Sequence, residues 1–366
     1  MSGALTGVRV VELAGIGPAQ LGAMLLADLG ADVVRIDRPG EGERDASGEL
    51  LSRGRRSVAL DLKDPEDVER ALRLADGADV FVDPFRPGVA ERIGVGPEVV
   101  CDRNPRIVYA RMTGWGQDGP LARAAGHDIN YIAIAGALEA IGPAGEVPPV
   151  PLNVIGDFGG GGMLMAFGVT AALLERERSG RGQVLDVAMV DGVAALLQGV
   201  LQIQAMGEWE PGRARNWLQG AAPWYRAYRT ADDGFVTVGA LEGKFYALLL
   251  ERLELDPADW PQWDTGRWQA LSERLERAFA RRTLDEWAAE LEGSDACFAP
   301  AVELARADEH PHVAARRTYV RRDGHLQAAP VPRFSRTPGA IGRTPPWPGQ
   351  HSSEVLSELE GGKVKT

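Results

Sequence analysis

Three titratable residues stand in surroundings that suit acid–base chemistry. His127, in the stretch AGHDINYIAIAG, is the only histidine before residue 300. Asp157 stands in NVIGDFGGGG, shortly before a run of glycines, and Glu242 stands in VGALEGKFY. Imidazole changes its charge near neutral pH, and apolar surroundings raise the pKa of a carboxyl group toward that range. Histidine and aspartate side chains in such surroundings could take up and release protons near neutral pH.

Each of these residues also has a structural interpretation. A lone histidine is commonly a satisfied structural residue, Asp157 could be a helix N-cap, and Glu242 taken alone is an ordinary surface glutamate. A helix that begins at Asp128, however, would leave its first N–H groups unpaired beside His127. Glycine is costly at a purely structural helix start, so the glycines after Asp157 suggest that a substrate lies against the backbone, and Gly126 would allow a similar approach.

Four basic residues at or shortly after predicted strand ends form a second candidate site. They are Arg38, Lys63, Arg86 and Arg92. They could converge on one anionic ligand, such as a phosphorylated nucleotide, since arginine matches phosphate oxygens; the alternative is four solvated surface cations. The turn AGIGPAQ lacks the third glycine of a dinucleotide fingerprint, because Gln20 takes its place, so a nicotinamide or flavin cofactor is not expected.

The elements that must position these residues follow from the hydrophobic pattern. Short β-branched runs alternate with helical patterns, which predicts a parallel sheet with helices on both faces, an α/β fold. The predicted strands are 8–13, 32–37, 57–62, 79–83, 107–111 and 183–189. The predicted helices begin at Pro18 and Pro65, run from the glycines after Asp157 to residue 179, and cover 191–206.

A different pattern begins at Tyr225. The sequence YRAYRTADDGFVTVGA predicts a hairpin that turns at Asp233-Gly234. With the helices that follow, it predicts a smaller α+β domain. The further elements expected are a polar linker at 207–222, helices near 243–252, 267–280 and 283–292, an extended segment at 327–348 and a short helix at 353–359.

Composition narrows the classes of function. The chain has 366 residues and a net charge of −12, so a nucleic-acid partner is not expected. Uninterrupted apolar runs are short, and neither a membrane span nor a signal peptide is expected. Cys101 and Cys297 are expected to be reduced thiols in a cytoplasmic protein. The remaining histidines lack a metal-ligand pattern, so no metal site is expected.

Several longer motifs occur in a fixed order along the whole chain. They are LTGVRVVELAGIGPAQLGAMLLADLGADVVRIDRPG, RRSVALDLK, DPFRPGVAERIGVGP, ARMTGWGQDGP, AGHDINYIAIAGAL, NVIGDFGGGGM, SGRGQVLDVAMVDG, DGFVTVGALEGKFY and HSSEVLSEL. In content and order they resemble the family III CoA-transferases (the CaiB–BaiF superfamily), and within that family the α-methylacyl-CoA racemase branch. The histidine in AGHDINY and the glutamate at Glu242 are the marks of that branch.

The resemblance implies a domain plan and a quaternary structure. A Rossmann-like large domain, 1–190, binds CoA and is completed by the C-terminal segment 325–366. A linker, 191–224, leads to a small α+β domain, 225–310, and a return linker covers 311–324. The family's chains form interlocked homodimers, in which each chain threads through the other.

The resemblance also assigns a substrate and its contacts. The substrate is an acyl-CoA, so coenzyme A is part of the substrate and no separate cofactor is implied. Arg38 is expected near the adenine. The other expected contacts are Leu60, Asp61, Leu62, Lys63, Pro84, Phe85, Arg86 and Arg92 along the nucleotide and phosphates, and Gly126, Asp128, Ile129, Asn130 and Tyr131 beside His127.

In the racemase branch, His127 and Asp157 would be the two opposed bases. Glu242, contributed by the partner subunit, would orient His127. The backbone N–H of Asp128 would donate to the enolate oxygen. Two other functions stay open: CoA transfer between carboxylic acids through an anhydride on Asp157, and a non-catalytic CoA-binding module. The acyl chain, whether a sterol side chain, a branched fatty acid or an arylpropionyl group, is open too.

Overall fold

The computed structural model describes residues 3–40 and 42–361, and the chain divides into two compact units. The larger unit is drawn from Met1–Ala137, Val150–Gln198 and Arg316–Thr366, and the smaller unit from Leu138–Pro149 and Gly199–Ala315. Both predicted linkers are divided between the units: 191–198 and 316–324 belong to the larger unit, and 199–224 and 311–315 belong to the smaller one. Residues 138–149, predicted in the large domain, also belong to the smaller unit.

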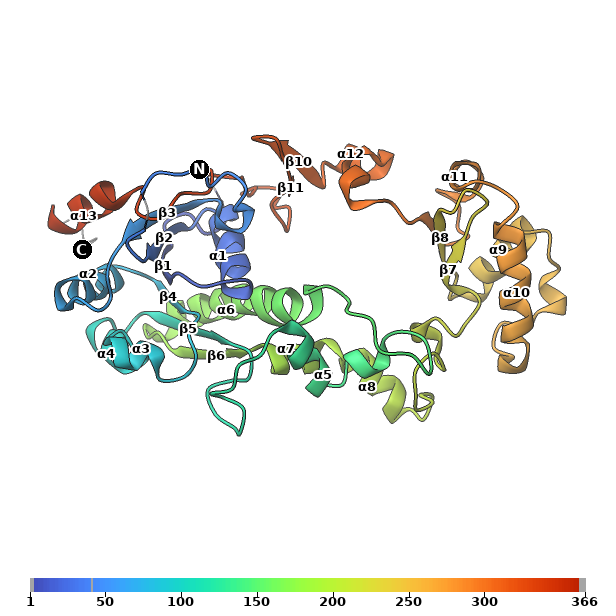
Figure 1. Cartoon of the computed structure of the whole chain (residues 1–366), viewed down its shortest axis with the longest axis horizontal. Coiled ribbons are helices and arrows are strands. Elements are labelled where there is room, and N and C mark those ends of the chain that lie inside the picture. The colour runs from blue at the N-terminus through green and yellow to red at the C-terminus, as the bar shows by residue number, and fades with distance from the viewer. Residues whose placement is uncertain (1–2, 41, 362–366) are drawn as a thin grey trace. The chain divides into compact units, whose positions relative to one another are not determined.

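The larger unit is built on a parallel sheet with the strand order β3-β2-β1-β4-β5-β6 (Figure 1). Its strands are β1 (Arg9–Leu13), β2 (Asp32–Asp37), β3 (Arg55–Ala59), β4 (Val80–Asp83), β5 (Val108–Thr113) and β6 (Val184–Ala188). The α/β class and the parallel sheet predicted from the sequence are confirmed. Strand β3 ends before the predicted residue 62, because the chain turns where the Asp64 N–H donates to the Asp61 carbonyl.

Successive strand residues point to opposite faces of the sheet, and each face carries its own hydrophobic core. Val10 and Val33 pack with α1 and α6 in one core, and Val11 and Val34 pack with α2, α4 and α13 in the other. Helices therefore cover both faces, as predicted. Their bounds are α1 (Pro18–Asp28), α2 (Pro65–Asp76), α3 (Val89–Ile93), α4 (Pro97–Arg103), α6 (Leu164–Ser179) and α13 (Ser352–Glu360).

The helix around Asp157 begins earlier than predicted. A π-helix, Val154–Met163, continues directly into α6, so Asp157 lies inside a helical segment and the N-cap position belongs to Asn153. The glycines hid this start in the sequence, because glycine is a poor helix former. Helix α5 (Asp128–Ile134) begins where the sequence predicted. The predicted single helix 191–206 is divided into α7 (Met189–Leu196) and α8 (Gln198–Ala205).

One helical run, Val154–Ser179, is long and apolar enough to cross a membrane by length and composition. The run was not predicted as a membrane span from the sequence, where only short uninterrupted apolar stretches stand out. Met165, Val169 and Ala172 of this run are buried in the core between α1 and the sheet. The core helix of a folded domain meets the same length and composition criteria, and length and composition alone are weak evidence for a membrane span.

The smaller unit contains an antiparallel sheet packed against helices. Its sheet has the order β7-β8-β9, and Asp233 occupies the turn of the predicted hairpin with a φ of 62°. Trp224 and Phe279 are fully buried in its core. The elements are β7 (Tyr225–Arg229), β8 (Phe235–Gly239), β9 (Phe298–Pro300), α9 (Gly243–Arg252), α10 (Trp268–Phe279) and α11 (Leu284–Leu291).

The chain returns to the larger unit through elements that the sequence analysis did not predict. They are α12 (Pro311–Arg316) and a hairpin of β10 (Tyr319–Arg322) and β11 (His325–Ala328). An extended segment then leads to α13, which lies beside α2, where Arg73 donates to the Leu359 carbonyl (Figure 1). The N-cap residue of α13, His351, contacts β3, an edge strand of the sheet.

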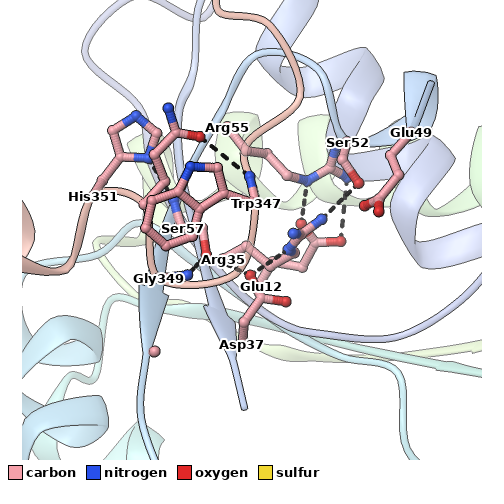
Figure 2. Close-up of polar contacts among 12 residues, drawn as sticks. Glu12, Arg35, Asp37, Glu49, Ser52, Arg55, Ser57, Trp347, Gly349 and His351 are labelled. Carbon is pink, nitrogen blue, oxygen red and sulfur yellow. Dashed lines mark hydrogen bonds and ion pairs between the residues drawn. The ribbon is translucent and has the colours of Figure 1, made fainter. Parts of the chain in front are cut away.

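The contact between His351 and β3 predicts a pH-dependent stability. The Ser57 N–H donates to His351 Nδ1 at 3.2 Å, and the His351 N–H donates to the Ser57 carbonyl at 2.9 Å (Figure 2). Burial lowers the pKa of His351, and Arg343 adds to this effect. The folded state thus binds the proton less readily than the unfolded chain. The stability from this contact is present above about pH 6.5 and is lost as the pH falls toward the lower folded pKa.

We therefore expect the thermal unfolding midpoint to fall between pH 7 and pH 5, and to fall less in His351→Asn. Asparagine keeps an acceptor oxygen at the position of Nδ1 and takes up no proton. His312→Asn, at an exposed histidine of the smaller unit, is the control and should follow the wild type. If the unfolding midpoint fell equally with pH in His351→Asn and in the wild type, His351 would not be the source of the pH dependence.

Candidate active site

A cleft of about 290 Å³ opens at the carboxyl ends of β1, β4 and β5. β1 has β2 on one side and β4 on the other, so the strand order reverses at this point of the sheet. Ligands of open parallel sheets bind in the crevice that such a reversal creates. The residues that line the cleft include Gly17, Pro84, Phe85, Arg86, Trp115, Gly126, His127, Tyr131 and Asp157.

His127 lies at the N-terminus of α5, with its side chain exposed at the cleft. Its own N–H donates to Asn130 Oδ1 at 3.1 Å, and the Tyr131 hydroxyl donates to the Gly126 carbonyl. These two hydrogen bonds fix the backbone on both sides of the imidazole. The ring is therefore held on an ordered turn at the edge of the cleft.

Gly126 lines the cleft, and the packing around it requires a glycine. A Cβ at this position would lie 2.8 Å from Tyr131 Cε1 and 3.0 Å from Trp115 Cζ2. Glycine is thus required because two aromatic rings of the protein, which pack edge to face, press against the backbone. The close approach is made by the protein's own rings, and it orders the turn that carries His127.

Asp157 lines the same cleft from the π-helix and is half-buried. Burial raises the pKa of its carboxyl group; a hydrogen bond from Asn153 opposes the rise, Asp128 adds to it and His127 lowers it. A raised pKa for this carboxyl group is what the sequence predicted. A carboxyl group with a raised pKa can hold or release a proton nearer to neutral pH.

Asn153 is the site residue that the sequence analysis missed. Its Nδ2 donates to Asp157 Oδ2 at 3.2 Å, one helical turn away. The spacing of four residues would have revealed this contact if the helix had been started before Asp157 instead of after the glycines. Asn153 stabilises the charged form of the Asp157 carboxyl group and orients it.

Close packing between helices also requires the four glycines after Asp157. A Cβ at Gly160 would lie 2.9 Å from the Val193 nitrogen, and one at Gly162 would lie 2.7 Å from the Pro18 carbonyl oxygen. The glycines therefore let the π-helix pack closely against α1 and α7. The backbone approached at these positions is that of neighbouring helices, and this packing fixes where Asp157 stands.

The turn before α1 completes this side of the cleft. Gly17, its N-cap residue, has a φ of 63°, which favours glycine. A Cβ there would lie 3.6 Å from Asp157 Oδ2.

The Tyr131 phenol stays neutral. Burial is the main cause that raises its pKa to about 12; Asp157 raises the pKa further and Arg86 lowers it.

The residues predicted to contact CoA are placed unevenly. Pro84, Phe85 and Arg86 line the cleft, and Asp83 Oδ1 accepts the Phe85 N–H at 2.9 Å, which holds their turn. Leu60 is buried in the core beneath the sheet edge, so only its backbone can face a ligand. The predicted contacts that do not line this cleft are Arg38, Leu60, Asp61, Leu62, Lys63, Arg92, Asp128, Ile129 and Asn130.

The cations Arg38, Lys63 and Arg92 are exposed, and each follows or lies near the carboxyl end of a strand, as predicted. Glu242 belongs to the smaller unit, where it is exposed and occupies the N-cap position of α9. The cleft of the larger unit thus brings together His127 and Asp157 with the turn at Pro84–Arg86, and Glu242 is no part of this cleft.

Comparison with known proteins identifies the family. A model of CoA-transferase family III matches residues 5–352. The chain belongs to CoA-transferase family III. The resemblance found in the sequence motifs is thereby confirmed along nearly the whole chain.

Among members of CoA-transferase family III, curated relatives give a closer comparison. The chain is 44% identical to a protein named alpha-methylacyl-CoA racemase from Mus musculus, over 97% of this chain and 93% of that protein. It is 42% identical to the protein of the same name from Homo sapiens, with the same shares covered. A solved structure of a CAIB/BAIF family protein from Brucella suis superposes with a TM-score of 0.85 and 25% identity, over 98% of this chain and 100% of that chain.

Proposed function

We propose that this protein is a racemase that interconverts the (R) and (S) forms of 2-methylacyl-CoA thioesters. The observation that carries the proposal is that His127 and Asp157, two groups able to exchange protons, line one cleft at the carboxyl edge of the sheet. The chain that presents them is 44% identical over nearly its full length to a protein named alpha-methylacyl-CoA racemase.

The reaction needs two acid–base groups in complementary protonation states. In one direction the Asp157 carboxylate takes the proton from C2, the bond electrons move into the thioester carbonyl to form an enolate, and the His127 imidazolium returns a proton to the opposite face. In the other direction neutral His127 takes the proton and protonated Asp157 returns one. The enzyme then ends each turnover in the state that starts the reverse reaction, and solvent exchange resets it.

The remaining parts of the site stabilise and hold the substrate. The backbone N–H of Asp128 is our candidate donor to the enolate oxygen; one such donor is worth roughly 10²–10³ in rate. The turn at Pro84–Arg86 and the exposed Arg38, Lys63 and Arg92 supply the surface and the positive charge for the CoA portion. Because CoA belongs to the substrate, the proposal assigns no resident cofactor.

We also propose that two copies of the chain form an interlocked homodimer, in which Glu242 of the partner subunit orients His127. Helix α6 supports an interface, because Phe167 and Leu174 on its outer face are 69% and 60% exposed. Apolar side chains in such a row on one helix face are typical of surfaces that a partner covers. The setting we propose is branched-chain lipid metabolism in the cytoplasm.

The main alternative, CoA transfer between carboxylic acids, differs in what Asp157 does. In a transferase this carboxylate attacks the thioester carbonyl, expels CoA as a thiolate and forms a mixed anhydride. Hydroxylamine, added during turnover, would convert that anhydride into a hydroxamate on Asp157. We expect no hydroxamate by mass spectrometry and no transfer of CoA to added carboxylates. A hydroxamate on Asp157 together with transfer would establish the transferase and overturn the racemase proposal.

A further inference from the structure

The side chain of Asp128 has a role separate from its backbone. Asp128 is only 6% exposed, although it stands next to the exposed His127. Its Oδ2 accepts the backbone N–H of Gly156 at 2.7 Å and the backbone N–H of Asp157 at 2.8 Å. One buried carboxylate thus joins the turn of His127 to the backbone of Asp157.

The two N–H groups are donors that a helix start leaves free. Gly156 and Asp157 stand in the first turn of the π-helix, whose N-cap residue makes no side-chain cap hydrogen bond. Such N–H groups need acceptors, and a negative charge is favoured at this end of a helix. Gly156 makes room for the contact, because a Cβ there would lie 2.7 Å from Asp128 Oδ2.

The second carboxylate oxygen is unusual. Asp128 Oδ1 is buried and finds no hydrogen-bond partner among the residues that the structure describes. A carboxylate with one fully used and one unused oxygen keeps a strong local field, because burial reduces screening by water. That field acts on Asp157, whose pKa is raised chiefly by burial and further by Asp128, while Asn153 and His127 lower it.

We propose that Asp128 is a positioning residue whose buried carboxylate locks the backbone of Asp157 against the turn that carries His127. The lock sets the spacing of the two bases across the cleft. The charge of the same carboxylate works against ionisation of Asp157, whereas the hydrogen bond from Asn153 works for it. This inference rests on the proposed racemase function for its effect on catalysis, but the contact itself can be tested without substrate.

Two substitutions distinguish the hydrogen bonds that Asp128 accepts from the effect of its negative charge. Asp128→Asn keeps an oxygen that can accept both N–H groups and removes the charge, so we expect the acid limb of kcat/KM against pH to move to lower pH. Asp128→Ala removes the acceptor, and we expect kcat to fall roughly 10²-fold with little change in KM, as a small misplacement of reacting groups does. A role confined to stability would lower the folded fraction and leave the pH limb in place.

A third substitution should shift the acid limb of the pH profile in the opposite direction. Asn153→Ala removes the donor to Asp157 Oδ2, so the acid limb should move to higher pH while the Asp128 contact stays intact. Asp102→Asn, an exposed residue on α4, makes the same change of charge as Asp128→Asn away from the cleft and should leave the profile unchanged. If Asp128→Asn does not fold, Asp128→Ala and Asn153→Ala still test the lock and the sign of the shift.

The decisive readout is a ¹³C NMR titration of the Asp157 carboxyl carbon in the intact protein. We expect its titration to move to lower pH in Asp128→Asn and to higher pH in Asn153→Ala. Unchanged titration in both variants, with kcat of Asp128→Ala at the wild-type level, would overturn the inference even in a working racemase. Shifted titrations in a protein that exchanges no C2 proton would uphold the contact and reject the proposed function instead.

Discussion

We expect His127→Gln and Asp157→Asn each to abolish inversion at C2 and to leave slow proton exchange for one enantiomer only. The reason is that each base serves one face of the substrate. In Asp157→Asn, His127 still meets the C2 proton of the enantiomer that presents it to the imidazole, and it returns a proton to the same face. In His127→Gln, Asp157 does the same for the opposite enantiomer. A positioned base contributes roughly 10²–10⁴ in rate, so a loss of that size or larger is expected.

The measurement uses pure (R) and pure (S) substrate in D₂O, with deuterium at C2 followed by mass spectrometry and configuration by chiral chromatography. Opposite enantiomer preferences in the two variants are the expected signature of opposed bases. His312→Ala, at an exposed histidine of the smaller unit, is the control and should racemise as the wild type does. Racemisation at the wild-type rate in either site variant would remove that residue from the mechanism.

Arg55→Met lowers the free energy of unfolding of the larger unit by about 3–5 kcal/mol, the loss expected when one partner of a buried ion pair is removed. Arg55 and Glu12 are both fully buried and form an ion pair (Figure 2). Arg55 also donates to the carbonyls of Leu51 and Gln20. Without Arg55 the Glu12 carboxylate stays buried and unpaired. Because Gln20 belongs to the first turn of α1, the pair also anchors the helix whose start borders Asp157.

The double variant Glu12→Leu/Arg55→Met is the informative comparison. It removes both charges and refills the space with apolar atoms, so its loss of stability should be smaller than that of Arg55→Met. Arg229→Met breaks an exposed ion pair with Asp233 and should change stability by about 1 kcal/mol or less. Urea unfolding followed by circular dichroism measures all three. If Arg55→Met were at least as stable as the double variant, an unpaired buried Glu12 would not be the cause of the loss.

The sheet and the location of the site were predictable from local pattern. Strands such as β1 (Arg9–Leu13) and β2 (Asp32–Asp37) are short β-branched runs between helical stretches, and that alternation specifies a parallel sheet. A parallel sheet in turn places residues after its strands on one edge, which is why Arg86 was assigned to the ligand side. Pro84 and Phe85 were assigned only through the family resemblance. His127 could be singled out because a titratable ring stood before a predictable helix start.

Other features depend on tertiary contacts that no local pattern reveals. The π-helix start at Val154 was missed because glycine argues against a helix unless neighbouring helices require its small size, as Pro18 and Val193 do here. The same misplaced start hid Asn153 and left Asp157 as a possible N-cap. The Arg55–Glu12 pair and the Asp128 contact join residues far apart in the sequence, and only the folded chain brings them together.

The most direct test of the central claim is the fate of the C2 proton in the wild-type protein. One pure enantiomer of a 2-methylacyl-CoA is incubated with the protein in D₂O and followed by NMR and chiral analysis. The two-base account predicts that deuterium enters at C2 while optical purity is lost, until both enantiomers are present equally. Retained optical purity without deuterium at C2, with CoA passing to an added carboxylate, would contradict it and assign Asp157 the role of a nucleophile.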